Sequence, residues 1–374
     1  MKIGIVCYPS YGGSGGFATS LAQELAKRNH EIHIISYDLP FNLSKDWPKN
    51  LHFHKVDVTD YPVFKESPYT IALTNKLAEV IQEERLDIVH AHYAMPHAVA
   101  LSMARKMVRR KIKTITTLHG TDATIMGKDQ NLGNTLEFAI KDSDAITTVS
   151  ESLAKEAKKN YNLKTTPHVI YNFVTTYKKS RITLRGLRKI FADPNEKILI
   201  HVSNFRPVKR IRDVIAVFDG VQKKIPAKLL LVGDGPDLIK AKQAARRKKI
   251  AGKVHFLGFQ LDIAKLLSIS DLFLLTSENE GFNLSALEAI SCGVPIIGSN
   301  TVGMSEMVTD NKAGVLSRVG NTKHMIKNAI ELLENKDKWL AYSINGMNAV
   351  KNKYRPEIIV PQYEELYKKV LKAK

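Results

Sequence analysis

Short apolar runs rich in Val and Ile alternate with longer segments of helical periodicity along this chain of 374 residues. The first run, KIGIVCY, ends at the glycine-rich stretch PSYGGSGG. The segment FATSLAQELAKRN then places Phe17, Leu21 and Leu25 on one face of a helix. The runs EIHIISY and LDIVHAHY repeat the strand-like pattern. This alternation predicts an α/β fold in which mostly parallel sheets carry helices on both faces.

The alternation weakens between residues 174 and 196, where charged residues, a glycine and a proline interrupt the pattern. We therefore predict a Rossmann-like domain at 1–173, a linker region at 174–196 and a second Rossmann-like, doubly wound domain at 197–354. The C-terminal helix, 355–374, is expected to pack back on the first domain. Because ligands bind open α/β sheets beyond the carboxyl ends of the strands, we expect a site in an interdomain cleft.

Composition excludes several classes of protein. The two cysteines, Cys7 and Cys292, lie far apart beside apolar residues, which favours free buried thiols and a cytoplasmic location. No run approaches the roughly 18 apolar residues of a membrane span, so stable membrane insertion is not expected. The net charge of +19 favours anionic partners, but no nucleic-acid-binding motif accompanies it.

The glycine-rich loop is the first candidate for a binding site. Gly15 and Gly16 let a ligand approach the backbone closely, and the Ser14 hydroxyl can donate a hydrogen bond. The N-terminus of the helix that follows attracts anions. A phosphate or carboxylate site and a plain tight turn between strand and helix both remain open.

Histidines and small polar residues mark the ends of two predicted strands. In HAHYAMPH, His90 and His92 point to the same face of a strand, but the nearby sequence does not favour a metal, and Tyr93 is the better candidate to line a pocket. In LHGTD, His119 can bond a sugar hydroxyl, or serve a structural role instead. Lys128 offers a cation in the loop downstream.

In the second domain, HVSNFRPVKR places Arg206 and Lys209 just after a strand. A forked guanidinium and a compact ammonium at a strand end suit a diphosphate, although an exposed cationic loop has the same sequence pattern. The turn in LLVGDGP is a weak signal by itself.

The stretch ENEGFNLSALEAISCGVP predicts a helix that begins near Asn283 and ends before Pro295. Its N-terminal amides can hold a phosphate. Glu288 lies among apolar neighbours, where an unpaired carboxylate is costly, so we expect hydroxyl donors for it, such as the two hydroxyls of a ribose. An exposed acid on a surface helix is the alternative.

Together these segments resemble the retaining glycosyltransferases of family 4, which have the GT-B fold, over nearly the full chain. The most specific mark is the pair Glu280 and Glu288, separated by seven residues within EGFNLSALEAISCGVPIIGSN. VGDGP, the GGSGG loop and SNFRPVKR support the resemblance. It implies two Rossmann-like domains facing a cleft, metal-independent transfer and no cofactor.

Several loops, among them CYPSYGGSGG, HAHYAMPHA and TTLHGTDATIMGKD, look like those of family members that transfer N-acetylglucosamine from UDP-GlcNAc to the hydroxyl of L-malate. That reaction begins bacillithiol biosynthesis. The implied catalytic residues are His119, Glu280, Arg206 and Lys209. The implied donor-binding residues are Gly15, Gly16, Arg206, Lys209, Phe259, Glu280, Gly281, Phe282, Asn283, Leu284 and Glu288. The implied acceptor-binding residues are Ser14, Tyr93, Thr121, Lys128, Asn204 and Arg206.

The chain departs from the family pattern at two places. Asn283 replaces a common glycine, and Ser203-Asn204 replaces a common Gly-Arg, which moves the arginine two positions on to Arg206. Two other functions stay open: a family member with a lipid or sugar acceptor, and a non-enzymatic binder of anions or nucleic acid. A homodimer is compatible with the sequence.

Overall fold

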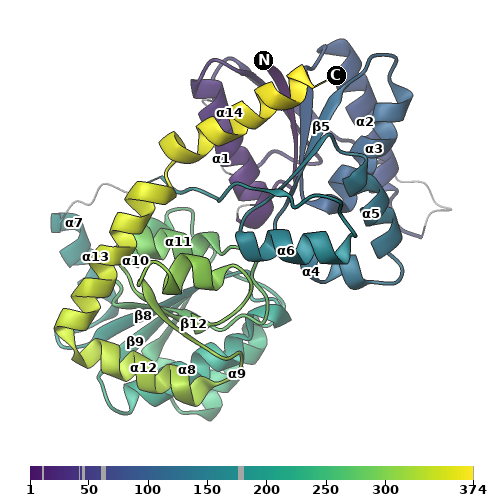
Figure 1. Ribbon diagram of the computed structural model, residues 1–374. Coiled ribbons are helices and arrows are strands. Elements are labelled where there is room, and N and C mark those ends of the chain that lie inside the picture. Colours follow the sequence, from purple (N-terminus) through teal and green to yellow (C-terminus); the bar gives the residue numbers. More distant parts are fainter. Residues whose placement is uncertain (11, 42, 44–46, 60–64, 176–180, 374) are drawn as a thin grey trace. The chain divides into compact units, whose positions relative to one another are not determined.

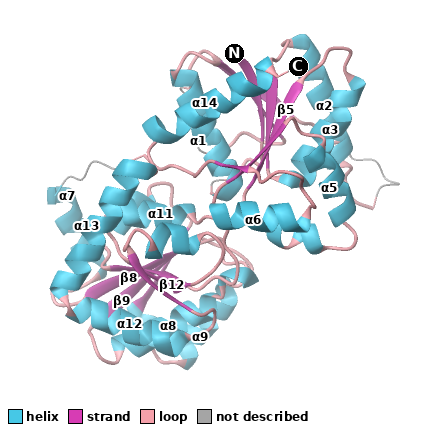
Figure 2. Cartoon of the chain, viewed as in Figure 1, coloured by secondary structure: helices cyan, strands magenta, loops and turns pink. Residues whose placement is uncertain are grey.

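The computed structural model describes residues 1–374 except 11, 42, 44–46, 60–64, 176–180 and 374. Tyr11 of the glycine-rich loop thus lies outside the described residues. The chain divides into two compact units. Unit 1 comprises Met1–Phe173 and Pro356–Lys374, and unit 2 comprises Val174–Arg355. Each unit has its own sheet with helices on both sides (Figures 1 and 2).

Unit 1 is built on a parallel sheet with the strand order β3-β2-β1-β4-β5-β6-β7. The strand order reverses between β1 and β4. Open α/β sheets bind ligands at the carboxyl ends of the strands beside such a switch point. The strands are β1 (Lys2–Val6), β2 (Glu31–Ser36), β3 (Leu51–Lys55), β4 (Ile88–His92), β5 (Lys113–Leu118), β6 (Ala145–Thr148) and β7 (His168–Val169).

Helices cover both faces of this sheet. Figure 1 shows α1 and α14 on one side of it and α2, α3 and α5 on the other. The helices are α1 (Gly13–Lys27), α2 (Tyr69–Glu83), the π-helix η1 (Ala94–Ala98), α3 (Val99–Met107), α4 (Thr121–Thr124), the 3-10 helix η2 (Met126–Lys128), α5 (Gly133–Lys141), α6 (Glu151–Asn160) and α14 (Pro356–Lys372).

The C-terminal helix α14 returns to unit 1. Its Glu364 carboxylate accepts from Arg28 and from the ring of His30, at 3.2 and 2.8 Å. The Tyr367 hydroxyl lies 2.8 Å from Nδ1 of His90 in β4. Because Tyr363 and Tyr367 are fully buried, this helix forms part of the core of unit 1.

Unit 2 contains a parallel sheet with the order β10-β9-β8-β11-β12-β13. The buried faces of its strands and of α8 and α12 form one continuous core around Phe218, Leu231 and Leu332. The strands are β8 (Lys197–Val202), β9 (Ala227–Val232), β10 (Val254–Gly258), β11 (Leu272–Leu275), β12 (Ile296–Ser299) and β13 (Gly314–Ser317).

The sheet of unit 2 also has helices on both faces (Figure 1). They are α7 (Arg181–Phe191), the 3-10 helix η3 (Pro207–Lys209), α8 (Ile211–Gln222), α9 (Leu238–Arg247), the 3-10 helix η4 (Ala251–Lys253), α10 (Ile263–Ser268), α11 (Leu284–Ser291), the π-helix η5 (Ser305–Thr309), α12 (Thr322–Glu334) and α13 (Lys336–Lys353). Helix α7 falls inside the predicted linker region. It is fixed to unit 2, since Arg188 donates to the Asp271 carboxylate at 2.9 Å.

Two parallel-sheet α/β units confirm the predicted fold class. Cys7 and Cys292 are free and buried, as expected. Among the helices that the structure describes, none combines the length and the apolar character that crossing a bilayer requires.

Candidate functional site

The glycine-rich loop of unit 1 permits only glycine at one position. A Cβ on Gly15 would lie 2.2 Å from the Tyr8 carbonyl oxygen and 2.5 Å from Oγ of Ser10. Gly15 and Gly16 are buried in the first turn of α1, and Ser14 is half-buried. No side chain among the described residues caps α1, and its first turn has no acidic residue. The start of this helix therefore has the charge and the close backbone approach that an anion requires.

Four histidines gather at the carboxyl ends of β4 and β5. Nδ1 of His92 lies 3.1 Å from Nε2 of His119, and Nδ1 of His97 donates to the His92 carbonyl at 2.7 Å. His90 sits between Tyr367 and the Thr117 hydroxyl, which is 2.6 Å from Nε2. These bonds account for His90 as a structural residue. They also place His119 at the outer end of the network.

Burial keeps this network neutral. It lowers the pKa of His119 to about 3, with the nearby His97 as a smaller cause, and it lowers the pKa of His97 to about 4. The pKa of His92 is also well below its ordinary value, mainly through burial. His119 is thus a neutral imidazole at pH 7, able to donate or accept one hydrogen bond. Its side chain keeps part of its surface exposed.

The loop after β5 is organised by a buried acid that sequence reasoning missed. The Asp122 carboxylate accepts from the backbone N–H groups of His119, Gly120 and Ala94, at 3.0, 2.8 and 3.1 Å. Burial nonetheless raises the pKa of Asp122 to about 6. Asp122 thereby joins the loop after β5 to the segment after β4. The only signal in the sequence was a polar residue two positions beyond a glycine.

The same join brings two predicted acceptor-binding residues together. The hydroxyls of Tyr93 and Thr121 share a short hydrogen bond, and Tyr8 packs edge-on against Tyr93. Lys128 is instead exposed on η2, with its ammonium 3.6 Å from the Glu156 carboxylate. The structure therefore groups Tyr93, Thr121 and His119 and gives Lys128 a different partner.

In unit 2, an ion pair joins the two most informative motifs. Nζ of Lys209, at the end of η3, lies 2.6 Å from Oε1 of Glu280, and the Ser277 hydroxyl donates to the same oxygen at 2.7 Å. Both Glu280 and Ser277 are buried. The pair brings a cation and an acid from distant segments of the chain to one place.

Hydrogen bonds to backbone carbonyls hold these two segments together. The Thr276 hydroxyl donates to the Lys209 carbonyl at 2.9 Å, and the Glu278 N–H donates to the Val208 carbonyl at 2.8 Å. Thr276 and Ser277 follow directly after β11. Sequence reasoning missed both residues, although a Thr-Ser pair at the end of an apolar strand is the kind of polar signal that marks a ligand-binding edge.

Helix α11 begins one residue after Asn283, close to the predicted start. Oδ1 of Asn283 accepts from the Ala286 N–H at 2.8 Å, so this side chain caps the helix. The side chain of Asn283, which the resemblance implies to be donor-binding, is thus already engaged through its oxygen atom. The cap satisfies one helix N–H.

Glu288 lies in the second turn of α11 and is half-buried. Within the described part of the chain its carboxylate has no hydrogen-bond or ion-pair partner, and burial raises its pKa to about 7. The structure thus rules out a fully exposed surface acid. A carboxylate in this environment gains from hydroxyl donors supplied by a ligand.

The other predicted residues of unit 2 differ in exposure. Arg206 and Asn204 are exposed in the loop after β8, and Phe259 is 49% exposed just after β10. Gly281, Phe282 and Asn283 are buried, whereas Leu284 is half-buried. The Arg206 guanidinium has no hydrogen bond or ion pair to any described residue. It remains available to a ligand.

The Gly-Asp-Gly turn after β9 has a structural reason. Cβ atoms on Gly233 and Gly235 would lie 1.8 Å from the Ser203 carbonyl oxygen and 2.0 Å from that of Asn204. Both glycines have positive φ values, of 116° and 151°. The turn therefore packs directly on the loop that carries Arg206. This contact explains a motif that is weak when read alone.

Solved structures with the same fold include a complex with UDP. The crystal structure of Anabaena HepE in complex with UDP has a TM-score of 0.81 at 19% identity, covering 98% of this chain and 99% of that one. Sucrose-phosphate synthase from Thermosynechococcus elongatus has a TM-score of 0.83 at 16% identity, and the match covers both chains fully. The protein thus has the GT-B fold, as predicted from the sequence.

Sequence comparisons define the family. Residues 11–178 match "Glycosyltransferase Family 4", and residues 187–348 match "Glycosyl transferases group 1". The chain is 44% identical to N-acetyl-alpha-D-glucosaminyl L-malate synthase of Bacillus anthracis, over 100% of this chain and 98% of that protein. It is 24% identical to alpha-monoglucosyldiacylglycerol synthase of Streptococcus pneumoniae, over 84% and 75%. The chain therefore belongs to the family-4 glycosyltransferases, and the predicted enzyme class is confirmed.

Proposed function

We propose that this enzyme transfers N-acetylglucosamine from UDP-GlcNAc to the hydroxyl of L-malate, with retention of anomeric configuration, as the first step of bacillithiol biosynthesis. The similarity to the Bacillus anthracis synthase, 44% over essentially both chains, carries the choice of substrates. The arrangement of Lys209, Glu280 and Glu288 supports a sugar nucleotide as donor.

Unit 2 carries most of the residues that we propose to bind the donor. Lys209, Arg206 and the start of α11 supply positive charge for the diphosphate. As the glycosidic bond breaks, negative charge grows on the leaving phosphate oxygen. Fixed cations and N–H groups that face this oxygen stabilise the transition state more than the ground state.

The two acids hold the rings on either side of the diphosphate. Glu288, without a protein partner among the described residues, accepts from the two ribose hydroxyls. Glu280 accepts from a hydroxyl of the transferred sugar while Lys209 and Ser277 fix its position. We assign the half-exposed aromatic ring of Phe259 and the backbone beside it to contact with the uracil.

The acceptor half rests on unit 1. The neutral His119 positions the sugar, because it can share one hydrogen bond with a hydroxyl without adding charge. Ser14, Tyr93 and Thr121 offer hydroxyls to the malate carboxylates. Lys128 can join these hydroxyls only by leaving Glu156.

In the proposed reaction, the bond between the sugar anomeric carbon and UDP breaks while the malate hydroxyl oxygen bonds to the same carbon from the same face. The hydroxyl proton passes to the leaving phosphate oxygen. This route needs no protein nucleophile. We also propose that neither a divalent metal nor a cofactor takes part, since the side-chain cations serve the diphosphate.

The test is incubation of the purified protein with UDP-GlcNAc and a panel of acceptors in the presence of EDTA. L-malate should give UDP and one glycosylated product by mass spectrometry, with an α-anomeric signal by NMR. D-malate, glycerol and L-lactate serve as matched small acceptors. Product only from a lipid or sugar acceptor would reject the malate assignment, and a β-anomer would reject retention.

A lipid acceptor is the second candidate, and one surface feature favours it. Helix α3 exposes Met103 and Met107 beside the cation of Lys106, an amphipathic pattern suited to an anionic lipid surface. The relative from Streptococcus pneumoniae is named for a monoglucosyldiacylglycerol product. Diacylglycerol in anionic vesicles therefore belongs in the acceptor panel.

A further inference from the structure

Three histidines and two acids gather at one edge of the sheet of unit 1, and none of them belongs to the candidate glycosyltransferase site. Strands β2 and β3 run parallel, with His33 beside His52 and Ile35 beside His54. Since side chains two positions apart lie on the same face of a strand, Glu31 and His33 share a face of β2. Glu84, just after α2, faces the same histidines.

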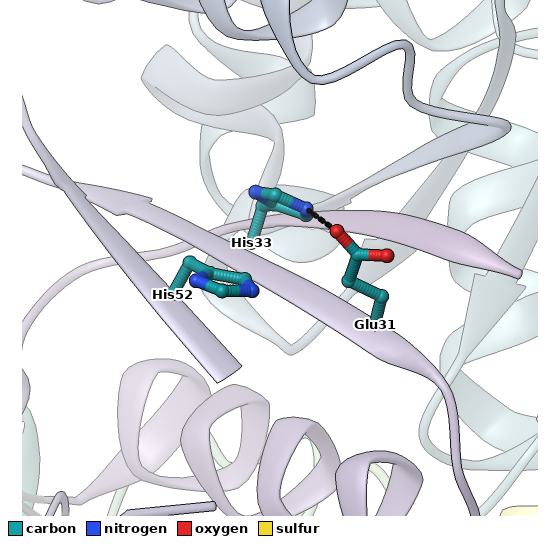
Figure 3. Close-up of side chains that lie close together, drawn as sticks. All are labelled: Glu31, His33 and His52. Carbon is teal, nitrogen blue, oxygen red and sulfur yellow. Dashed lines mark ion pairs between the residues drawn. The ribbon is translucent and has the colours of Figure 1, made fainter. Parts of the chain in front are cut away.

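Within the described residues, two groups of His, Cys, Asp and Glu side chains are spaced closely enough to hold a metal ion, and both contain His33. In one group, ligand atoms of Glu31, His33 and His52 all lie within 4.8 Å of one another. Figure 3 shows the edge of the His33 ring directed at the Glu31 carboxylate, with His52 alongside. Nε2 of His33 lies 3.5 Å from Oε1 of Glu31.

These spacings suit tetrahedral coordination. Two ligands about 2.0–2.1 Å from Zn²⁺ at a tetrahedral angle lie roughly 3.3 Å apart. The His33–Glu31 distance already has this value to within the tolerance of a side-chain rotation. His52 is exposed, so its ring can turn toward the ion at little cost. His33 itself is 1% exposed and is held in place by the strands.

The second nitrogen of His33 has the partner that a metal ligand usually has. Nδ1 lies 2.9 Å from Nε2 of His54. A ligating histidine commonly donates its other ring N–H to a neighbour, which fixes the tautomer. When Nδ1–H donates to His54, the lone pair of Nε2 faces Glu31. That buried nitrogen has no hydrogen bond to any described residue, and a cation would satisfy it.

The charges around the site permit a cation. The Glu31 carboxylate supplies a negative charge, and the rings of His33 and His52 supply nitrogen atoms that can bind a cation. The Lys2 ammonium lies 2.9 Å from Oε1 of Glu31. Lys2 is a competitor that an incoming ion must displace from this oxygen or share with it.

We propose that Glu31, His33 and His52 bind one divalent first-row transition-metal ion of the Zn²⁺ type. Imidazole and carboxylate ligands suit these metals, and three protein ligands leave at least one position for water. The exposed His52 and the partly exposed Glu31 give the ion a path from solvent. The ion joins the edge strand β3 to β2.

The rival group consists of His33, His54 and Glu84. In that group, Nδ1 of His33 already lies 2.9 Å from Nε2 of His54. The Glu31 group instead uses Nε2 of His33, which has no hydrogen bond to a described residue, although Lys2 competes for the carboxylate, so the structure favours this group. Both His33 and His52 lie in the amino-terminal halves of their strands, at a distance from the strand ends that carry His119 and Tyr93.

The test is zinc binding to the full chain after removal of any affinity tag, measured by calorimetry and by the visible absorption of bound Co²⁺. We expect one equivalent to bind. The His52→Ala and Glu31→Gln variants should bind at least 10-fold more weakly. His168→Ala is the matched control, because it removes an exposed strand histidine from the same unit, and Glu84→Gln tests the rival group. Both should bind like the wild type.

A second readout separates binding from folding. Zinc should raise the Tm of the wild-type protein and of His168→Ala, but not that of His52→Ala, because a ligand of the native state alone stabilises it by mass action. Equal zinc affinity in the wild type, His52→Ala and Glu31→Gln would overturn the proposal. The proposal would also be overturned if Glu84→Gln lost zinc binding while His52→Ala kept it. Glycosyl transfer in EDTA is a separate outcome that this site does not affect.

Discussion

The Lys209 ammonium lies 2.6 Å from the Glu280 carboxylate, although the two residues are 71 positions apart in the chain. The pair connects the loop after β8 with the loop after β11, at the carboxyl ends of neighbouring strands. Neighbouring strand ends of this kind are where α/β sheets assemble ligand sites from distant segments. The relationship links the two motifs on which the family resemblance rests.

Replacing Lys209 with Ala should lower kcat about 100- to 1000-fold, because losing one group that stabilises developing charge costs about 3–4 kcal/mol. Initial rates of UDP release with saturating L-malate measure this. Lys224→Ala is the control, since that lysine is exposed in the same unit. A Lys209→Ala enzyme within threefold of wild type, with an unchanged Tm, would remove Lys209 from the catalytic residues.

Glu288 should recognise the ribose of the donor. We expect Glu288→Gln to bind UDP about 10- to 100-fold more weakly, since hydrogen bonds to a charged acceptor are worth about 1.5–3 kcal/mol. Calorimetry measures the affinities of the wild type and of Glu288→Gln for UDP and for 2′-deoxy-UDP, so that the protein change and the ligand change can be compared separately and together. The wild type should prefer UDP clearly, and the variant should discriminate little. Equal discrimination by both proteins would place Glu288 away from the ribose.

The glycine loop offers a matched pair of substitutions. A Cβ on Gly15 would meet backbone at 2.2 Å, whereas nothing lies within 4 Å of one on Gly12, whose φ is −123°. Gly15→Ala should therefore lower the free energy of unfolding by about 1–3 kcal/mol and weaken donor binding, while Gly12→Ala should stay within about 0.5 kcal/mol of wild type. Urea denaturation measures both. Equal stabilities would mean that the loop has room to relax.

Unit 1 should lose stability as the pH falls from 7 to 5. Burial lowers the pKa values of His90 and His119 to about 3 and that of His97 to about 4, so these groups stay neutral in the folded state. The unfolded chain takes up protons near its ordinary value of about 6.5, which favours unfolding below that pH. Each histidine contributes about 1–2 kcal/mol over this window.

Hydrogen exchange resolved by segment measures this effect, with unit 2 as the internal reference. His201 is the only histidine of unit 2 in the described chain that is fully buried, so unit 2 should respond less. Replacing His97 with Gln should flatten the pH dependence of unit 1. Protection in β4 and β5 that does not change between pH 7 and pH 5 would contradict the prediction.

Part of the site could be predicted because its signals are local. The apolar periodicity located the strands, and the segment around Glu280 and Glu288 indicated both the helix and its buried acid. The half-burial of Glu288 and the start of α11 after Asn283 agree with that interpretation. Local periodicity reports burial directly, because it reflects which side of an element faces the core.

Other parts could not be predicted, because they depend on which segments meet. Asp122 reaches three backbone N–H groups from two loops, and Ser277 completes the bonds around Glu280. The helix-capping role of Asn283 was not among the predictions, and Lys128, predicted to bind the acceptor, instead lies 3.6 Å from the Glu156 carboxylate. Long-range partners follow from strand order and loop conformation.

The sequence by itself determined the α/β class, the family and the residue types available for a sugar nucleotide. Periodicity and motif spacing depend on residues that are near one another in the chain, so they can be recognised without knowledge of the fold. Only the tertiary structure decided that Lys209 pairs with Glu280 and that His33, His52 and Glu31 share one face of the sheet. The register between two strands fixes which side chains converge, and a shift of one residue would send each to the opposite face.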